Sequence, residues 1–341
     1  RCCRRCSCLG LLAIVAVLAA LLLDVPVVER AAVCLAGLPM RPLPQAEDPE
    51  GRLRRVHVVY SGDQRSMGGM FVSMHSLARS QPAPELLTIH LIVAKEDMAN
   101  FTTMVECLRA EFAESKASAP AFEFHELRPL PFDPSNNTFG KHEGGIGIGT
   151  ATLPSCWLRI WLGDYLAVPR VIWLDHDVLV YGDIAPLYRM KMQHPLAAAP
   201  EWISKKILQA GVLLLDLDRF RNENLPDEML GSVRKAHEVT TDFSDQDVLN
   251  WHFPLERRDA LNWRWNAGSM GIVFMTPEDT RWLPKQSFVE RAGVGLIQWS
   301  SRIVYERCLD QVRMAHLNWG PKFWWQNATF PRCDMVKRVA P

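Results

Sequence analysis

Between residues 56 and 127, short apolar runs alternate with longer segments whose apolar residues recur every three or four positions. The short runs are rich in β-branched residues and are typical of buried strands, whereas the longer segments have helical spacing. The expected order is strand 56–60, helix 67–79, strand 87–94, helix 96–114 and strand 122–127. Strands that alternate with helices form a parallel sheet with helices on its faces. This pattern predicts an α/β fold with a mostly parallel sheet flanked by helices.

The second half of the chain continues the pattern after a segment dense in Pro, Asn and Gly at residues 129–150, which we expect to be a loop. The expected elements are helix 154–166, strand 170–174, strand 211–217 and a helix that begins at residue 245. At 341 residues, the chain is long enough for one large domain or two fused lobes.

An apolar run near the N-terminus predicts a membrane anchor. The segment Leu9–Leu23 carries no charge, and the run extends to Val28 with Asp24 and Pro26 as interruptions. Three arginines precede it, namely Arg1, Arg4 and Arg5. Basic residues favour the cytosolic side, so we expect a single-pass type II protein of the Golgi or endoplasmic reticulum membrane with its main domain in the lumen. A cleaved signal peptide is the alternative interpretation.

This interpretation divides the chain into five parts. Residues 39–51 are rich in Pro and acidic residues without apolar periodicity, which is typical of a short stem. The expected parts are a cytosolic tail at 1–8, a transmembrane signal-anchor at 9–28, a stem at 29–54, a globular domain at 55–330 and a C-terminal tail at 331–341.

Two further patterns suit a lumenal domain. N-glycosylation sequons occur at Asn100, Asn136 and Asn327. Four cysteines of the globular part would then lie in an oxidising space, and they allow three pairings between which the sequence does not choose. They are Cys107, Cys156, Cys308 and Cys333.

The charge balance excludes one class of partner. Lys and Arg number 38, as do Asp and Glu, so the formal net charge is zero. A protein held on nucleic acid by phosphate contacts needs a basic excess. We therefore expect no nucleic-acid partner.

Two carboxylates follow a short apolar strand. Asp175 and Asp177 come directly after Val171–Leu174, at the carboxyl edge where open α/β sheets bind ligands. Hard divalent cations prefer oxygen ligands, and such a pair leaves coordination positions open for diphosphate oxygens. An isolated D-x-D is usually a solvated turn or a cap, but the apolar runs on both sides favour a metal site here.

Two later segments carry further polar groups. His316-Leu-Asn-Trp-Gly320-Pro-Lys322 offers an imidazole for a metal and, beyond a glycine, a lysine for phosphate oxygens. Asp245-Gln246-Asp247 lies at a predicted helix start, where these groups cap the helix, bind sugar hydroxyls or stabilise positive charge on a reacting anomeric carbon.

Taken together and in this order, the motifs resemble those of glycosyltransferase family 8, over about residues 55–325. The matching blocks are Arg159–Leu166, Val171–Asp183, Ala210–Leu217, Asp245–Asn250 and His316–Trp324. The resemblance implies a GT-A fold, a UDP-sugar donor, usually Mn²⁺, retention of anomeric configuration, and a glycan or glycoprotein acceptor.

The resemblance also implies roles for individual residues. The metal ligands would be Asp175, Asp177 and His316, and the residue beneath the anomeric carbon would be Gln246. The donor-binding residues would be Asp63, Arg159, Asp175, Gln209, Asp245, Gly320 and Lys322. An amide is a poor nucleophile, so we favour front-face displacement over a double displacement through Asp245.

Some residues depart from the family pattern. Gln209 replaces the usual Asn before Ala-Gly, Trp319 takes the usual Gly position, and Phe323 replaces Pro. These departures support a second hypothesis, a catalytically weakened relative that acts as a sugar-binding or scaffold protein. A glycoside hydrolase is disfavoured, because its paired carboxylates flank the scissile bond across a cleft instead of lying within one tripeptide.

Overall fold

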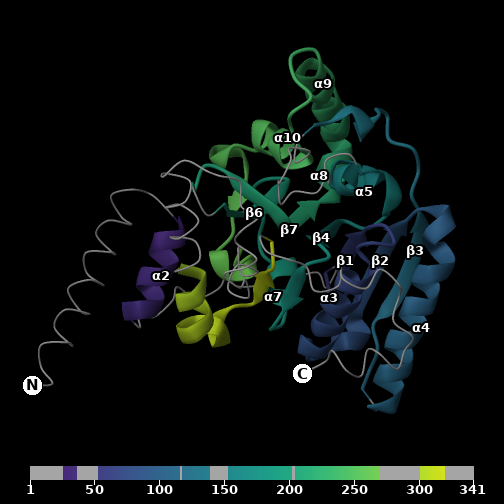
Figure 1. The fold of residues 1–341 in the computed structure, drawn as a ribbon, viewed down its shortest axis with the longest axis vertical. Coiled ribbons are helices and arrows are strands. Elements are labelled where there is room, and N and C mark those ends of the chain that lie inside the picture. The colour runs from purple at the N-terminus through teal and green to yellow at the C-terminus, as the bar shows by residue number, and fades with distance from the viewer. Residues whose placement is uncertain are drawn as a thin grey trace, which may run out of the picture.

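A seven-stranded sheet forms the centre of the molecule (Figure 1). The computed structural model describes residues 26–36, 53–115, 117–138, 153–201, 204–268 and 300–318. The strand order is β3-β2-β1-β4-β7-β6-β8, and a separate two-stranded sheet pairs β5 with β9.

The first half of the sheet follows the predicted alternation closely. Its elements are β1 (Val56–Ser61), α3 (Met67–Ser80), β2 (Leu87–Val93), α4 (Met98–Glu114) and β3 (Ala121–Glu126). The three strands are parallel, and β1 also pairs in parallel with β4 (Arg170–Leu174). The predicted α/β fold with a mostly parallel sheet is therefore confirmed for this half.

The second half of the sheet contains antiparallel pairs. Strand β7 (Leu208–Asp216) runs antiparallel to both of its neighbours, β4 and β6 (Leu196–Pro200), and β8 (Asp259–Ala260) pairs in parallel with β6. Only residues 201–207 connect β6 to β7, which is too short for a parallel crossover and requires a hairpin-like reversal. The reversal brings the beginning of β7 beside the end of β4.

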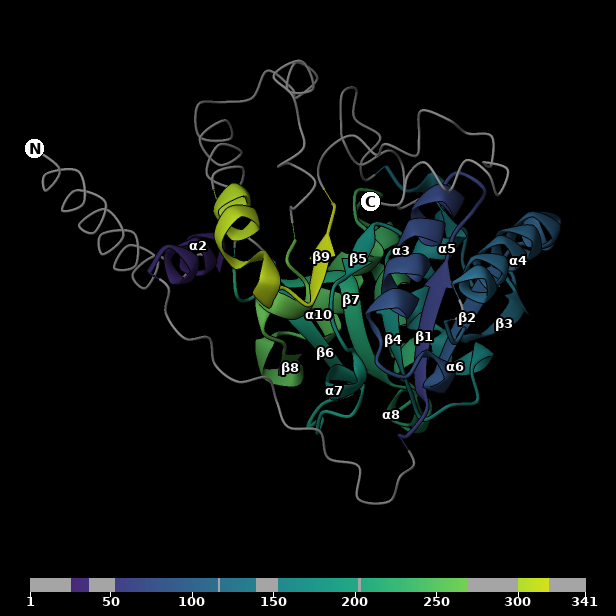
Figure 2. The ribbon, with the colours of Figure 1, turned by 90° about the horizontal axis from the view of Figure 1, so that it is seen from below.

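Helices cover both faces of the sheet. On one face, the buried side chains of α3 and α4 pack against β1 and β2 in one apolar cluster. The other face is covered by α8 (Leu217–Asn222), α9 (Leu225–His237) and α10 (Asp245–His252), which contribute to a second cluster. Figure 2 shows α3 and α4 beside β1, β2 and β3.

The predicted helix 154–166 is wrong as a single element. It consists of α5 (Pro154–Trp157), a 3₁₀ turn at Leu158–Ile160 and α6 (Leu162–Tyr165). All six side chains from 157 to 162 are buried, so the segment has no solvent face of the kind that a regular amphipathic helix presents. The tighter turn places Arg159 inside the protein.

Short elements complete the described part. They are α7 (Ala185–Tyr188), β5 (Val178–Val180), β9 (Met314–His316) and the 3₁₀ turns Pro84–Leu86, Lys95–Asp97, Pro134–Asn136, Leu255–Arg257, Trp263–Trp265 and Leu309–Gln311. Two predicted sequons, Asn100 in α4 and Asn136 in a 3₁₀ turn, are exposed, and Asn327 lies outside the described residues.

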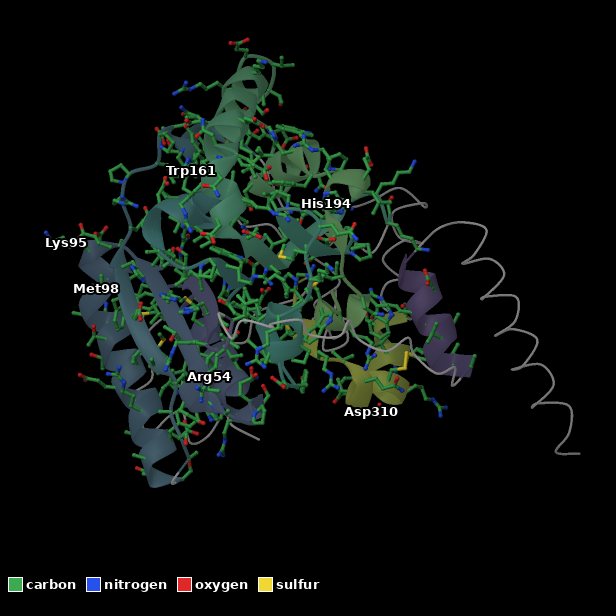
Figure 3. The ribbon with its side chains drawn as sticks, turned by 180° about the vertical axis from the view of Figure 1, so that it is seen from behind. Arg54, Lys95, Met98, Trp161, His194 and Asp310 are labelled. Atoms are coloured by element: carbon green, nitrogen blue, oxygen red, sulfur yellow. A yellow bond between two sulfur atoms is a disulfide. The ribbon has the colours of Figure 1, made fainter. Side chains whose placement is uncertain are left out.

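A disulfide joins the N-terminal helix α2 (Pro26–Ala36) to the rest of the protein. Cys34 is bonded to Cys308, and the yellow S–S bond in Figure 3 links α2 to the helical segment 300–308 beside it. An ion pair adds to this link, since Oε2 of Glu29 lies 2.9 Å from Nζ of Lys205. Residues 29–36 of the predicted stem are therefore helical and attached to the domain.

None of the three pairings that the sequence left open among its four cysteines is present, because Cys308 is bonded to Cys34, which was not one of the four, and Cys156 is free. Cys107 is also disulfide-bonded, and Cys333 lies outside the described residues. The spacing of the cysteines in the sequence does not predict that Cys34 pairs with a cysteine 274 residues away.

The predicted anchor at 9–28 lies outside the described residues except for its last three positions, which begin α2. Among the helices that the structure does describe, none combines the length and the apolar character needed to cross a bilayer.

The disulfide gives the first prediction. Cys34→Ser should lower the free energy of unfolding by about 2–5 kcal/mol, since removing a native disulfide frees the unfolded chain. Thermal unfolding followed by circular dichroism measures the change. In a reducing agent, the wild type and the variant should unfold at the same temperature; equal stability under oxidising conditions would contradict the prediction.

Candidate active site

The candidate site lies where the strand order changes direction. Strand β1 lies between β2 and β4, and the connection after β3 returns the chain to the opposite side of β1. Open α/β sheets bind ligands in the crevice at such a point, outside the carboxyl ends of the strands. Asp63 follows β1, and Asp175 follows β4, so both are delivered to this edge.

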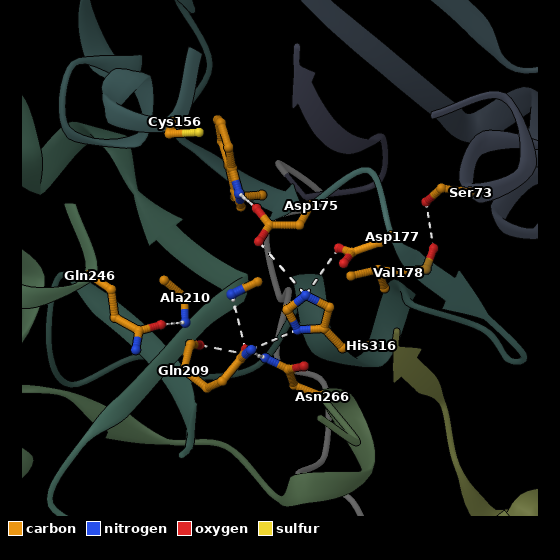
Figure 4. A network of polar contacts seen from close by, with 12 residues as sticks. Ser73, Cys156, Asp175, Asp177, Val178, Gln209, Ala210, Gln246, Asn266 and His316 are labelled. Carbon is orange, nitrogen blue, oxygen red and sulfur yellow. Dashed lines mark hydrogen bonds and ion pairs between the residues drawn. The ribbon is translucent and has the colours of Figure 1, made fainter. Parts of the chain in front are cut away.

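Three predicted metal ligands come together at this edge (Figure 4). The ligand atoms of Asp175, Asp177 and His316 all lie within 4.8 Å of one another. Nε2 of His316 lies 3.0 Å from Oδ1 of Asp177 and 3.8 Å from Oδ2 of Asp175. Two carboxylates and an imidazole suit a divalent cation that keeps open positions for another ligand.

Strand pairing brings the distant histidine to the two carboxylates. His316 ends β9, which pairs antiparallel with β5 and sets His316 opposite Val178, the residue after Asp177. The backbone N–H of Leu317 donates to the carbonyl of Asp177 at 2.8 Å. The position of His316 is therefore set by backbone hydrogen bonds on both of its sides.

Strand β7 packs directly against the imidazole of His316. Nε2 of Gln209 lies 2.7 Å from Nδ1 of the ring, which leaves Nε2 of His316 facing the carboxylates. The side-chain oxygen of Gln209 accepts from the backbone N–H of Gly211 at 3.0 Å and from Asn266. A methyl group on Gly211 would overlap the ring of His316, so a glycine is required there.

A buried arginine connects the carboxylate of β4 to that of α10. The guanidinium of Arg159 lies 3.2 Å from Oδ1 of Asp175 and 2.9 Å from Oδ2 of Asp245. It stacks 4.6 Å from the ring centroid of Trp173 and donates to the carbonyl of Ala210 at 2.7 Å. Burial opposes its charge, but the carboxylates Asp245 and Asp175 raise the pKa of Arg159 above its ordinary value.

Asp245 is itself buried. Burial raises the pKa of its carboxyl to about 6, Arg159 acts in the opposite direction, and Asp175 adds to the increase. The predicted alternative, that the acidic residues at this helix start are simple caps, holds for Asp247, which forms a capping box with Ser244. It does not hold for Asp245, whose side chain pairs with Arg159.

Gln246 and Asn250 attach α10 to β7. Oε1 of Gln246 accepts from the backbone N–H of Ala210 at 3.0 Å. Oδ1 of Asn250 accepts from the backbone N–H of Leu208 at 2.8 Å, and its amide donates to the carbonyl of Gln246 at 2.8 Å. The amide of Gln246 is thereby held next to the segment that contacts His316.

Of the remaining predicted residues, the structure describes only Asp63. The carboxylate of Asp63 pairs with Arg65 at 2.7 Å and accepts from the backbone of Ser66, both within its own loop. Gly320 and Lys322 lie outside the described residues. The structure thus brings together the predicted residues on β4, β7, β9 and α10 with Arg159.

Sequence reasoning missed two side chains that orient the cluster. The indole N–H of Trp173 donates to Oδ1 of Asp175 at 2.7 Å, and Asn266 donates to Gln209. A signal existed for Trp173, because residues two apart in a strand lie on the same face. The approach of Asn266 depends on the tertiary fold.

The sequence matches the model of the family described as glycosyl transferase family 8 over residues 57–328. The chain belongs to glycosyl transferase family 8. Members of this family transfer sugars from nucleotide-sugar donors. The resemblance inferred from the motifs is therefore confirmed.

Two curated relatives show how low the sequence identity is within the family. Glycosyltransferase GlyE of Streptococcus pneumoniae serotype 4 is 21% identical over 198 residues, which cover 58% of this chain and 44% of GlyE. Probable galacturonosyltransferase-like 7 of Arabidopsis thaliana is 25% identical over 193 residues, which cover 49% of this chain and 48% of the relative. The chain thus matches less than half the length of these relatives.

Solved structures show the same fold. The crystal structure of GlyE from S. pneumoniae superposes with a TM-score of 0.55 at 17% identity, over 83% of this chain and 62% of GlyE. The structure of the galactosyltransferase LgtC in complex with donor and acceptor sugar analogues superposes with a TM-score of 0.52 at 18% identity, over 83% of this chain and 94% of LgtC. Mouse xyloside xylosyltransferase 1 superposes with a TM-score of 0.53 at 15% identity, over 77% of this chain and 98% of that protein.

The buried ion pairs predict a pH-dependent stability change. Arg159→Ala should lower the free energy of unfolding by about 3–5 kcal/mol at about pH 8, because the carboxylate of Asp245 stays buried without its cation. The folded pKa of Asp245 would then rise further above its unfolded value of about 3.9. Protonation of Asp245 would therefore stabilise the folded variant more than the folded wild type as the pH falls. The difference in free energy of unfolding between the wild type and the variant should narrow towards pH 5.

Urea unfolding across this pH range measures the difference. Arg128→Ala is the matched control, since Arg128 also stacks on an aromatic ring, that of Tyr165, at 4.2 Å but is exposed. A stability loss in Arg159→Ala that does not change with pH would contradict the assigned role of Asp245.

Proposed function

We propose that the protein is a metal-dependent, retaining glycosyltransferase that moves a sugar from a UDP-sugar to a glycan or glycoprotein acceptor. The observation that carries the proposal is the convergence of Asp175, Asp177 and His316 at the strand-order crevice. Their donor set fits Mn²⁺, which accepts carboxylate oxygen and imidazole nitrogen. When bound, such an ion neutralises the charge that develops on a departing diphosphate.

The protein's own residues hold the reacting groups in place. Arg159 keeps Asp175 and Asp245 fixed in a buried network, so that both are preorganised before the donor binds. Gln246 is fixed by Ala210 and cannot act as a strong nucleophile, because it is an amide. The carboxylate of Asp245 is already paired with Arg159, which favours an electrostatic role over covalent attack. These features support front-face displacement.

A lumenal location in the Golgi or endoplasmic reticulum completes the proposal. The disulfide between Cys34 and Cys308 suits an oxidising compartment. Asn100 and Asn136 are exposed and accessible to glycosylation. The apolar run at 9–28, preceded by arginines, supports a type II anchor.

The proposed metal site is tested by Asp177→Asn. Without one carboxylate ligand, Mn²⁺-dependent hydrolysis of UDP-sugars should fall by at least about 100-fold, because the substitution removes a charge and a ligand atom from the ion. A panel of UDP-sugars, each assayed for release of UDP by the full chain with added Mn²⁺ or EDTA, measures this and identifies the donor.

Asp164→Asn is the matched control, since it makes the same chemical change at an exposed carboxylate of α6. Full activity of Asp177→Asn in EDTA would refute the metal site. If the wild type binds UDP-sugars but releases no UDP with any donor, the protein is the catalytically weakened sugar-binding relative.

Stereochemistry gives a further prediction. Gln246→Ala should lower turnover substantially without eliminating it, because the groups that stabilise the leaving diphosphate remain. Asp245→Asn should be at least as damaging, since it removes a negative charge near an oxocarbenium-like centre. The first product of every active variant should keep the α configuration of the donor. An NMR time course that shows a β-linked first product would overturn the retaining assignment.

A further inference from the structure

Three histidines form a diagonal row across the parallel strands β1, β2 and β3. His57 is in β1, His90 in β2 and His125 in β3. Thr88 pairs with His57 and Glu123 with His90, so each histidine lies two residues beyond the partner of the previous one. Side chains two residues apart point to the same face, so the row lies on one face of the sheet.

The ring nitrogens of this row lie at contact distance. Nδ1 of His57 is 3.0 Å from Nε2 of His90, and Nδ1 of His90 is 3.1 Å from Nε2 of His125. Nδ1 of His90 is also 3.3 Å from Oε2 of Glu123, the residue opposite it in β3. Nδ1 of His90 either carries one proton or accepts one, so it forms a good hydrogen bond with only one of His125 and Glu123. A hydrogen-bonded chain of rings therefore leaves the approach of Glu123 to this nitrogen without an explanation.

The spacing fits a tetrahedral metal. Zinc binds nitrogen and oxygen ligands at about 2.0–2.2 Å, which places neighbouring ligand atoms about 3.3–3.5 Å apart. The two separations at Nδ1 of His90, 3.1 and 3.3 Å, are close to this value. One ion between His90, His125 and Glu123 would satisfy all three groups at once.

The surroundings supply the other features of a built site. Metal-bound histidines donate their second ring N–H to an acceptor that fixes the ring. With Nδ1 of His90 on the metal, its Nε2–H would donate to Nδ1 of His57, which lies 3.0 Å away. His90 is 2% exposed, whereas Glu123 is 56% exposed and gives access from solvent.

We propose that His90, His125 and Glu123 form a second metal site, separate from the candidate active site, which binds zinc and fastens the edge strand β3 to β2. Its two nitrogens and one carboxylate favour zinc, whereas the two carboxylates and one imidazole at Asp175 are better suited to a harder ion. None of its ligands belongs to the cluster around Asp175, so the proposal does not depend on the proposed reaction.

Zinc stoichiometry tests the proposal directly. The full chain, stripped with a chelator, is titrated with zinc against a chromophoric competitor, and the number of bound equivalents is counted. We expect His125→Ala and Glu123→Ala each to bind one equivalent fewer than the wild type. Other zinc-binding groups, including the N-terminal cysteines and the candidate active site, are unchanged in these variants and cancel in the comparison.

His75→Ala and Glu111→Ala are the matched controls. These two residues form a pair of the same kind, at 2.7 Å between α3 and α4, but belong to neither three-ligand group found among the described residues. Both controls should bind as much zinc as the wild type. Zinc should also raise the melting temperature of the wild type and the controls more than that of the two site variants.

Glu123→Ala keeps the test decisive if His125→Ala fails to fold, because Glu123 is exposed on an edge strand. A folded Glu123→Ala variant that binds the wild-type number of zinc ions with wild-type affinity would overturn the proposal. The row would then be a hydrogen-bonded chain of neutral histidines. UDP release by the wild type is a separate measurement, and its absence would bear on the proposed function alone.

Discussion

The buried guanidinium of Arg159 connects most of the groups in the candidate active site. It pairs with Asp175 and Asp245, stacks on Trp173 and donates to the backbone of Ala210. A buried cation is tolerated only when its charge is compensated, and the buried carboxylate of Asp245 needs the cation in turn. Strands β4 and β7 and helix α10 are therefore held in one relative arrangement.

The same network explains why the segment around Arg159 is not one regular helix. A chain buried on all sides between 157 and 162 has to direct a guanidinium inwards, and the 3₁₀ turn does this between two short helices. The reversal of β7 has a related consequence. It places Gln209 and Gly211 beside the end of β4, where one orients His316 and the other leaves room for it.

Gln209, which stands where the family usually has an asparagine, contacts the predicted metal ligand His316 in this arrangement. Its longer side chain reaches Nδ1 of His316 while its oxygen accepts from Gly211 and Asn266. The substitution therefore places an amide against the predicted metal ligand. This contact is compatible with an active transferase, because the carboxylates and Nε2 of the imidazole still face one another.

The sequence by itself determined the strands β1 to β4, the helices between the first three, and the placement of Asp175 and Asp177 at a strand end, because these follow from local periodicity and short spacing. The motifs also identified the family. Only the tertiary structure decided the reversal of β7, the attachment of α2 through Cys34 and the arrival of His316 beside Asp177. Those depend on pairing between distant segments through backbone groups that every residue carries, so no local pattern specifies the partner.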